Sequence, residues 1–226
     1  SFWSEEENAP RYHADGRLVS KIRSYKLART YSNILLTPMD NSLDFAEALA
    51  FNQTLGFVGS NLISQETQKY INFYRKNRER YEDSEDVANV AVLRSYASLT
   101  YNNAAAQLCA VLVEQALIQS CIPFDLVFDV GLRNLSKYKV LILPNSECLS
   151  EDQVSLIRRH VDGGRGLVVI GQTGLYDEWR RVRITPGLNG LVDKQDLASD
   201  YQERVESQAG KEPTTARKLV GGGRVG

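Results

Sequence analysis

The sequence predicts an α/β fold: a parallel, flavodoxin-like sheet with helices on both faces, plus an N-terminal, mainly helical segment. Four short runs that are apolar and almost free of charge carry this prediction: Val87–Leu93, Phe124–Phe128, Val140–Leu143 and Leu167–Ile170. Because strands joined by helical crossovers pair in parallel, and such crossovers are right-handed, these runs are expected to form one wound sheet.

The first crossover helix is predicted over residues 102–119, directly after the first strand. Ala105, Leu108, Leu112 and Ala116 recur at helical spacing, so this row is expected to face the sheet. The second strand follows Pro123, and Pro144 closes the third.

The next helix has the clearest signal in the sequence. Ser150 and Gln153 form a capping box in which each side chain can bond the other residue's backbone N–H. The apolar row of this helix is Val154, Ile157 and Val161, and Gly163-Gly164 provide the positive φ that ends it.

The N-terminal segment is predicted to contain helices over residues 18–31 and 43–55, the second ended by Gly56 and Gly59. A further helix is capped by Ser64 and continues to Tyr81. Its mostly aromatic face consists of Tyr70, Ile71, Tyr74, Asn77 and Tyr81. The basic residues Arg75, Lys76, Arg78 and Arg80 alternate with Glu79 and Glu82, which favours a solvated face over a basic binding site.

The pattern fades after Tyr176, and a long surface excursion rich in Arg, Gly and Asp is expected there. Residues 219–225 are predicted to be the approach to another strand that the chain does not complete.

Composition excludes several classes of function. A formal charge of −1, from 27 basic and 28 acidic residues, supplies no field for a nucleic-acid backbone, so no nucleic-acid partner is expected. Apolar stretches such as residues 140–144 are far below the roughly 20 residues of a membrane span, so no membrane partner is expected. Residues 1–7 lack the features of a secretory signal, which predicts a cytoplasmic location.

Cys109, Cys121 and Cys148 lack metal-site spacing and are expected to be buried, reduced thiols.

One part of the chain resembles a known family. Its residues are Tyr138-Lys-Val-Leu-Ile-Leu-Pro-Asn145, Leu149-Ser-Glu-Asp-Gln153, His160-Val-Asp-Gly-Gly164 and Val169-Ile-Gly-Gln-Thr-Gly174. They resemble the trimerisation domain of family 42 glycoside hydrolases, which are β-galactosidases, and that domain is similar in fold to class I glutamine amidotransferases. Tyr70–Leu93 resembles the helix leading out of the catalytic TIM barrel, and residues 1–60 resemble the end of that barrel more weakly.

The resemblance implies two domains: a barrel remnant with its linking helix over residues 1–86, and an amidotransferase-like domain over residues 87–226. It implies a non-catalytic accessory and oligomerisation region, with the carbohydrate substrate and most of the catalytic barrel belonging to a parent β-galactosidase-like enzyme. The partner is expected to be a second copy of the chain, in a homo-oligomer such as a trimer. No catalytic, cofactor-binding or metal-binding residue is predicted, and the chain alone is expected to be inactive.

Class I amidotransferases carry a nucleophilic cysteine on a strand-to-helix turn, but the corresponding turn here is Gly171-Gln172-Thr173-Gly174. Glutamine hydrolysis is therefore not expected. A Cys148–His160 couple is allowed by spacing, although a packed thiol and a half-exposed helical imidazole are favoured. The same turn is only a weak candidate for binding phosphate, because it lacks both the G-x-G-x-x-G and Walker patterns.

Glu5, Glu6 and Glu7, beside Trp3, are the only acidic cluster placed near a barrel strand end. Trp can stack on a sugar ring and Glu can protonate a glycosidic oxygen, but a solvated acidic terminus is favoured. A barrel needs about 250 residues, so the segment before Val87 cannot close one.

Two alternatives remain open. One is a stand-alone sugar or small-molecule binding module that uses the crevice at the carboxyl ends of the strands, near Tyr96, Asn145 and Gln172. The other is a cysteine-dependent, amidotransferase-like enzyme with Cys148 as nucleophile.

Overall fold

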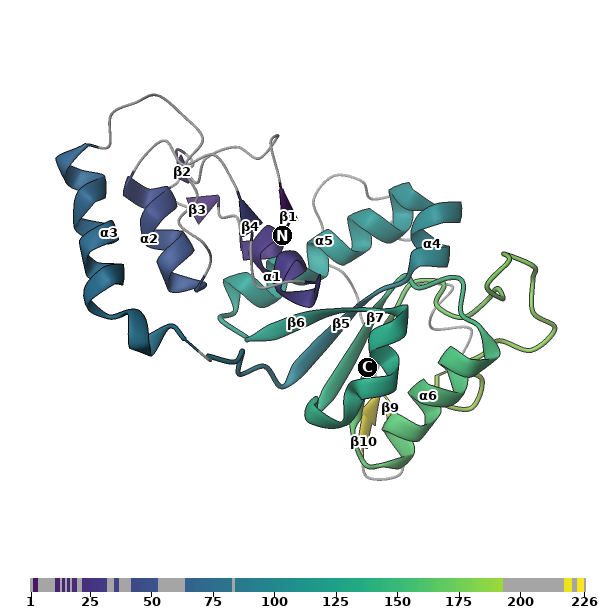
Figure 1. Cartoon of the computed structure of the whole chain (residues 1–226). Coiled ribbons are helices and arrows are strands. Elements are labelled where there is room, and N and C mark those ends of the chain that lie inside the picture. The colour runs from purple at the N-terminus through teal and green to yellow at the C-terminus, as the bar shows by residue number, and fades with distance from the viewer. Residues whose placement is uncertain are drawn as a thin grey trace. The chain divides into compact units, whose positions relative to one another are not determined.

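A computed structural model describes residues 2–3, 11–12, 14, 16, 18–19, 22–31, 35–36, 42–52, 64–82, 84–192, 218–220 and 223–225. The chain divides into two compact units, residues 1–86 and residues 87–226 (Figure 1). No described helix is both long enough and apolar enough to cross a membrane.

The first unit combines short strands with helices. Its elements are β1 (Phe2–Trp3), β2 (Arg11–Tyr12), β3 (Leu18–Val19), α1 (Ile22–Tyr31), β4 (Leu35–Leu36), α2 (Ser42–Ala50), α3 (Gln65–Lys76) and η1 (Arg78–Arg80). β1 and β4 pair in parallel, whereas β2 and β3 form an antiparallel pair. Tyr25 and Ala28 of α1 pack with Phe45 and Ala48 of α2 in a small hydrophobic core.

Helix boundaries in the first unit differ from those predicted. The helix expected from Leu18 begins at Ile22, because Leu18–Val19 pair with β2 as a strand. α2 ends at Ala50, and residues 53–60 lie outside the described part of the chain. The Ser64 cap is confirmed: Ser64 Oγ accepts a hydrogen bond from the Thr67 backbone N–H at 3.2 Å.

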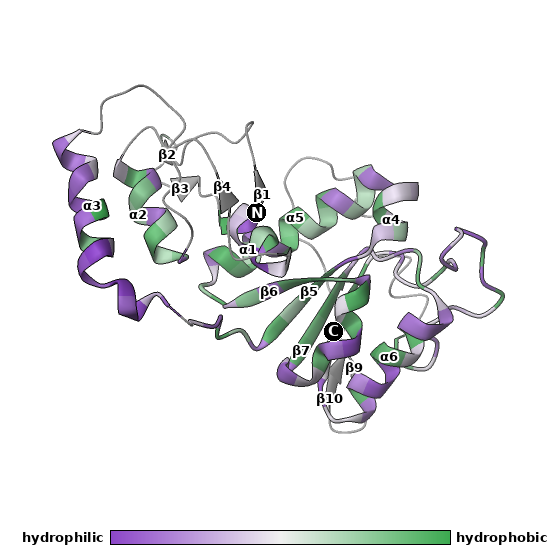
Figure 2. Cartoon of the chain, viewed as in Figure 1, coloured by the Kyte–Doolittle hydropathy of each residue, from purple (hydrophilic) through white to green (hydrophobic). Residues whose placement is uncertain are grey.

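The aromatic helix is shorter than predicted. α3 ends at Lys76, and Tyr81 lies in a turn after η1. Its ring still packs against that of Tyr74, with centroids 5.3 Å apart. Most of α3 is hydrophilic (Figure 2). Arg75 and Lys76 of α3 and Arg78 and Arg80 of η1 are all exposed, and Arg78 pairs with Glu82 at 2.7 Å. These basic residues therefore belong to a solvated face.

The second unit is built on the predicted sheet. Its main elements are β5 (Val90–Arg94), α4 (Tyr96–Tyr101), α5 (Asn103–Gln119), β6 (Phe124–Phe128), η2 (Asp129–Lys137), β7 (Val140–Pro144), α6 (Glu151–Asp162) and β8 (Gly166–Ile170). The strand order is β6-β5-β7-β8, and all three pairings are parallel. This is the 2-1-3-4 order of flavodoxin-like folds, and the predicted fold class is confirmed.

The sheet continues beyond β8. β10 (Gly223–Val225) pairs in parallel with β8, and β9 (Lys218–Val220) pairs antiparallel with β10. The single incomplete strand expected at residues 219–225 is therefore wrong, because residues 218–220 and 223–225 form two short strands that pair with each other. β10 occupies the fifth position of the 2-1-3-4-5 order.

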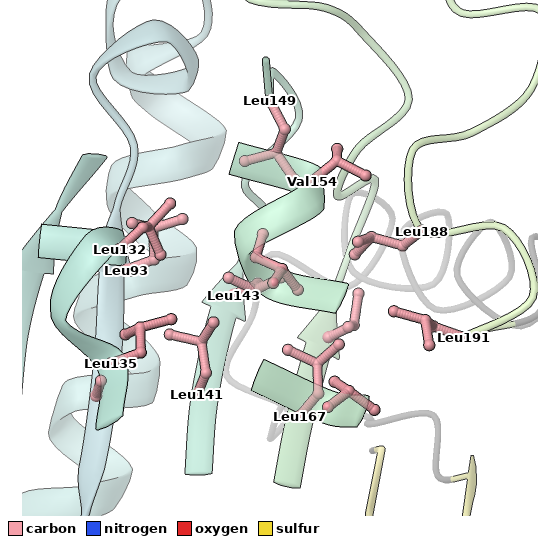
Figure 3. Packing of buried hydrophobic residues seen from close by; sticks show 14 of the residues in the cluster. Leu93, Leu132, Leu135, Leu141, Leu143, Leu149, Val154, Leu167, Leu188 and Leu191 are labelled. Atoms are coloured by element: carbon pink, nitrogen blue, oxygen red, sulfur yellow. The ribbon is translucent and has the colours of Figure 1, made fainter. Parts of the chain in front are cut away.

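The main core lies between the sheet and the η2–α6 layer (Figure 3). The strands contribute Leu93, Leu141, Leu143, Leu167 and Val169. The covering layer contributes Leu132, Leu135, Val154, Ile157 and Val161. α5 covers the opposite face of the sheet (Figure 1). The predicted apolar row of α6 is confirmed, as is its capping box, with bonds of 2.7 and 3.2 Å between Ser150 and Gln153.

Three other expectations for this unit need correction. β5 starts at Val90, and Val87 is 85% exposed, because the chain enters the sheet only after Asn89. Of the two glycines expected to end α6, Gly163 and Gly164, only Gly164 has a positive φ. The segment after Tyr176 is not wholly a surface excursion, since Leu188, Leu191 and Val192 return to the core. Residues 193–217 lie outside the described part.

The predicted sheet-facing row of the first crossover helix is also wrong. The helix is broken at Asn102 into α4 and α5. Leu108 and Leu112 are 56% and 42% exposed, and the residues that α5 buries are instead Ala106, Ala110, Val113, Glu114 and Leu117. Small alanines allow the helix to approach the sheet closely, and Glu114 pairs with Arg94 at the end of β5.

Candidate functional site

The carboxyl ends of the parallel strands form the candidate site, because ligands of open α/β sheets bind at this edge. Directly after β7, Asn145, Ser146, Glu147 and Cys148 are all buried. The fold therefore places four consecutive polar or thiol-bearing residues at the centre of the edge.

Glu147 is the centre of this group and is only 1% exposed. Its Oε1 accepts hydrogen bonds from Asn102 Nδ2 at 2.7 Å and from Asn145 Nδ2 at 3.0 Å. Its Oε2 lies 3.5 Å from a guanidinium nitrogen of Arg180. A buried carboxylate is tolerated only when it is paired and hydrogen-bonded, and these three partners meet that requirement.

Asn145 links this carboxylate to the turn after β8. Its backbone is in the left-handed region, with φ of 45°, and its Oδ1 accepts the backbone N–H of Gln172 at 2.9 Å. Gly171, with φ of 68°, must be a glycine, because a Cβ there would collide with the Asn145 side chain.

Thr173 closes the same turn. Its Oγ1 donates to the carbonyl of Ile170 at 2.9 Å and accepts the N–H of Ser146 at 3.0 Å. The Gly174 N–H donates to the carbonyl of Ser146. Since the N–H groups of Gln172 and Gly174 already have protein acceptors, the geometry does not favour the weak hypothesis of a phosphate-binding turn.

The backbone N–H and carbonyl of Cys148 are both hydrogen-bonded to serine side chains at the start of α4. Its N–H donates to Ser98 Oγ at 3.0 Å, and its carbonyl accepts from Ser95 Oγ at 3.2 Å. Burial, followed by the negative charge of Glu147, raises the pKa of the Cys148 thiol to about 11. A cysteine nucleophile requires the opposite shift, so this thiol is unsuited to attack at neutral pH.

His160 is not placed to activate Cys148. Its side chain is buried near the end of α6, which corrects the expected half-exposed imidazole. Burial and the nearby Arg165 lower its pKa. Cys148, in contrast, is surrounded by Ser98, Glu147 and Arg180, and none of its described contacts involves His160. The other two thiols also differ from expectation: Cys121 is exposed and Cys109 is half-buried.

Tyr96 lies on another part of the edge. Its N–H donates to Asp129 Oδ2 at 2.8 Å, and its ring stacks on Phe128 with centroids 5.0 Å apart. Burial raises the pKa of Asp129. Of the three residues predicted to line a crevice, the structure joins Asn145 to the Gln172 backbone, whereas Tyr96 has separate partners.

A small pocket under α4 is lined in part by Ser95, Ser98, Ala106 and Pro144. Its volume of about 10 Å³ is room for one water molecule, against the roughly 300–1,000 Å³ of typical ligand sites. It cannot hold a sugar ring.

Arg180 comes from a hairpin that sequence reasoning did not identify. The hairpin is closed by a bridge between Tyr176 and Val182, and Asp177 Oδ1 accepts the N–H groups of Trp179 and Arg181. Arg180, with φ of 59°, stacks its guanidinium over the Tyr176 ring at 5.4 Å.

Asn102, Glu147 and Arg180 were all missed by the sequence analysis. They lie 45 and 33 positions apart, so no local motif joins them. The position of Glu147 just after a buried strand was the one available signal.

Glu5, Glu6 and Glu7 lie outside the described residues, so their role remains a prediction. Among described residues, no group of three or more His, Cys, Asp or Glu side chains could hold a metal ion.

Comparisons with known proteins point to one group of solved structures. No protein-family model matches the sequence, and no curated protein matches it. The β-galactosidase from Rahnella sp. R3 aligns with a TM-score of 0.60 and 13% identity, covering 80% of this chain and 34% of that one. A catalytic mutant of Gan42B, a family 42 β-galactosidase from G. stearothermophilus, aligns with a TM-score of 0.57 and 17% identity, covering 71% and 30%.

An exo-carrageenase of family 42 from Bacteroides ovatus aligns with a TM-score of 0.53 and 10% identity, covering 86% of this chain and 33% of that chain. The chain shares its fold with parts of family 42 glycoside hydrolases. It spans about a third of the length of these enzymes.

Proposed function

We propose that the chain is a non-catalytic accessory region of a β-galactosidase-like glycoside hydrolase and supports its homo-oligomeric assembly. Carbohydrate binding and hydrolysis then belong to the parent enzyme, whose catalytic barrel lies mostly upstream of residue 1. The second unit is the assembly domain, of the trimerisation type, and the first unit is the end of the barrel with its linking helix.

The first unit supports this proposal through its strand pairing. β1 and β4 are parallel, and α1 lies between them in the chain. Parallel strands joined through a helix are the building unit of a TIM barrel, and here the connection between β1 and β4 also contains the antiparallel pair β2–β3. Because a barrel needs about 250 residues, 86 residues supply only its last part.

The observation that carries the non-catalytic assignment is the closed carboxyl edge of the sheet. Glu147, Asn145, Thr173 and the turn after β8 satisfy one another. A catalytic or binding site instead keeps polar groups free to meet a substrate. The same bonds disfavour a sugar site at Asn145 and Gln172, and the raised pKa of Cys148 disfavours a cysteine-dependent enzyme.

The full chain provides a direct test with two readouts. Light scattering after size-exclusion chromatography should give a mass of at least twice the 25.4 kDa of one chain. Incubation with an aryl β-galactoside should give no hydrolysis above the buffer rate. Turnover by the purified chain would contradict the non-catalytic assignment, and a monomer at all concentrations would contradict the assembly role.

A further inference from the structure

The exposed side of α5 carries a continuous apolar row. Ala104, Leu108, Leu112 and Ala116 follow one another at four-residue spacing, so they lie along a single ridge of the helix. All four are exposed, and the two leucines keep about half of their surface in solvent. Their spacing makes them one contiguous apolar strip, and contiguous exposed apolar surface marks interaction sites more than single exposed residues do.

This side of α5 is also free of charge. Glu114 is the only charged residue among the 17 of the helix, and it is fully buried in an ion pair with Arg94. Amide side chains flank the ridge, at Asn103, Gln115 and Gln119. In contrast, the exposed side of α6 carries Glu151, Asp152, Arg159 and Asp162.

We propose that the α5 ridge, Ala104–Leu108–Leu112–Ala116, is the surface through which copies of this chain pack against one another. The inference rests on the assembly role proposed above and deepens it by naming the contact surface. Its partner is the same ridge of a second copy.

The chemistry of the ridge favours a second copy over a partner of a different kind. In a symmetric assembly, identical residues meet near the axis, and any charge there faces a like charge. An uncharged ridge avoids this repulsion, and the amides that flank it can both donate and accept hydrogen bonds with their own copies. A charged partner would instead lose water opposite leucines without gaining an ion pair.

The shape of the ridge is also suited to self-packing. Four-residue ridges of two helices interdigitate in the most common class of helix packing. The alanines at both ends let the backbones approach, while the two leucines provide the buried area. Such a ridge meets its own copy across a two-fold axis.

The test compares the full chain with Leu108→Lys, Leu112→Lys and the double variant, by sedimentation equilibrium over a range of concentrations. Lysine is a good helix former, so the helix should persist. Each variant should weaken self-association by at least roughly tenfold, since an interfacial leucine is replaced by a charge that meets its own copy. The double variant should be monomeric.

Val182→Lys is the matched control, because Val182 is 77% exposed and belongs to the hairpin and not to the α5 ridge. It should leave the mass distribution unchanged. If the wild-type chain assembles and the leucine variants assemble equally well, the ridge proposal is overturned while the assembly role stands. A wild-type monomer would overturn both.

A third outcome is also informative. If the leucine variants lower the melting temperature of a chain whose mass they do not change, the ridge is covered within one chain, and the proposal is again overturned. Far-UV circular dichroism of each variant verifies that α5 is still folded.

Discussion

Helices α5 and α6 cover opposite faces of one sheet but use different chemistry to do so (Figure 1). α6 buries the branched side chains Val154, Ile157 and Val161 and exposes charged residues. α5 buries Ala106, Ala110, Val113, Leu117 and an ion pair, and it exposes Leu108 and Leu112. A helix can thus carry apolar side chains on its outer side as well as on the side that faces its sheet, and the outer side of α5 is the one proposed above as an assembly contact.

The largest effect is expected from the ion pair that holds α5. Glu114→Ala removes the carboxylate that accepts from Arg94 Nε at 2.7 Å and from Nη2 at 2.9 Å. The nearly buried guanidinium is then left without its partner charge, which should lower the free energy of unfolding by about 3–5 kcal/mol. Denaturant unfolding followed by circular dichroism measures the change.

Lys137→Ala is the control for this prediction, since it breaks the exposed pair between Lys137 and Asp125. Its cost should stay below about 1 kcal/mol. Equal losses for the two variants would show that the orientation of α5 does not depend on the buried pair.

The next prediction contrasts one apolar residue from each helix. Ile157→Ala leaves a cavity in the core and should cost about 2–5 kcal/mol of stability. Leu112→Ala on the exposed side of α5 should change the stability of the monomer by no more than about 0.5 kcal/mol. The same unfolding experiment, performed at protein concentrations where the chain is monomeric, measures both. A large loss for Leu112→Ala would mean that this side of α5 is covered within the chain.

Two cysteines extend the comparison to the loops beside these helices. Cys121 follows α5 and is exposed, whereas Cys148 precedes α6 and is buried. With a pKa of about 11, only about one Cys148 thiol in a thousand is ionised at pH 8. Iodoacetamide should therefore modify Cys148 at least roughly a hundredfold more slowly than Cys121.

Mass spectrometry of timed digests measures this ratio, and faster reaction at Cys148 would revive the cysteine-nucleophile hypothesis. The raised pKa also predicts a pH dependence. The folded state binds the Cys148 thiol proton more tightly than the unfolded state does. The resulting contribution to the free energy of unfolding is fully present below about pH 8.5 and is lost as the pH rises through about 11.

The smallest effect is expected at the start of α6. Ser150→Ala removes the acceptor for the Gln153 N–H and one half of the capping box, which should cost about 1 kcal/mol. Ser155→Ala, in the exposed middle of the same helix, is the control and should be neutral or slightly stabilising. Thermal unfolding of the two variants distinguishes a cap effect from a general effect of losing a hydroxyl.

Most of the sheet was predictable because its strands are buried on both faces. Phe124–Phe128 was predicted residue for residue, and β7 and β8 each differ by a single residue at one end. Their parallel pairing followed from the helical crossovers, and the structure gave the order β6-β5-β7-β8. The candidate site was less predictable. Asn145 was identified from its position after β7, but the other partners of Glu147 are Asn102, between α4 and α5, and Arg180, in a hairpin more than 30 residues later.

By itself, the sequence determined the α/β class, the parallel sheet and the capped start of α6, because local periodicity and capping chemistry act over a few residues. Only the tertiary structure decided which side of α5 faces the sheet and where the buried carboxylates find their partners. α5 has apolar residues on two sides, so its hydropathy allows either orientation. In the structure, Glu114 pairs with Arg94, twenty positions earlier in the chain, a contact that the local hydropathy pattern does not reveal.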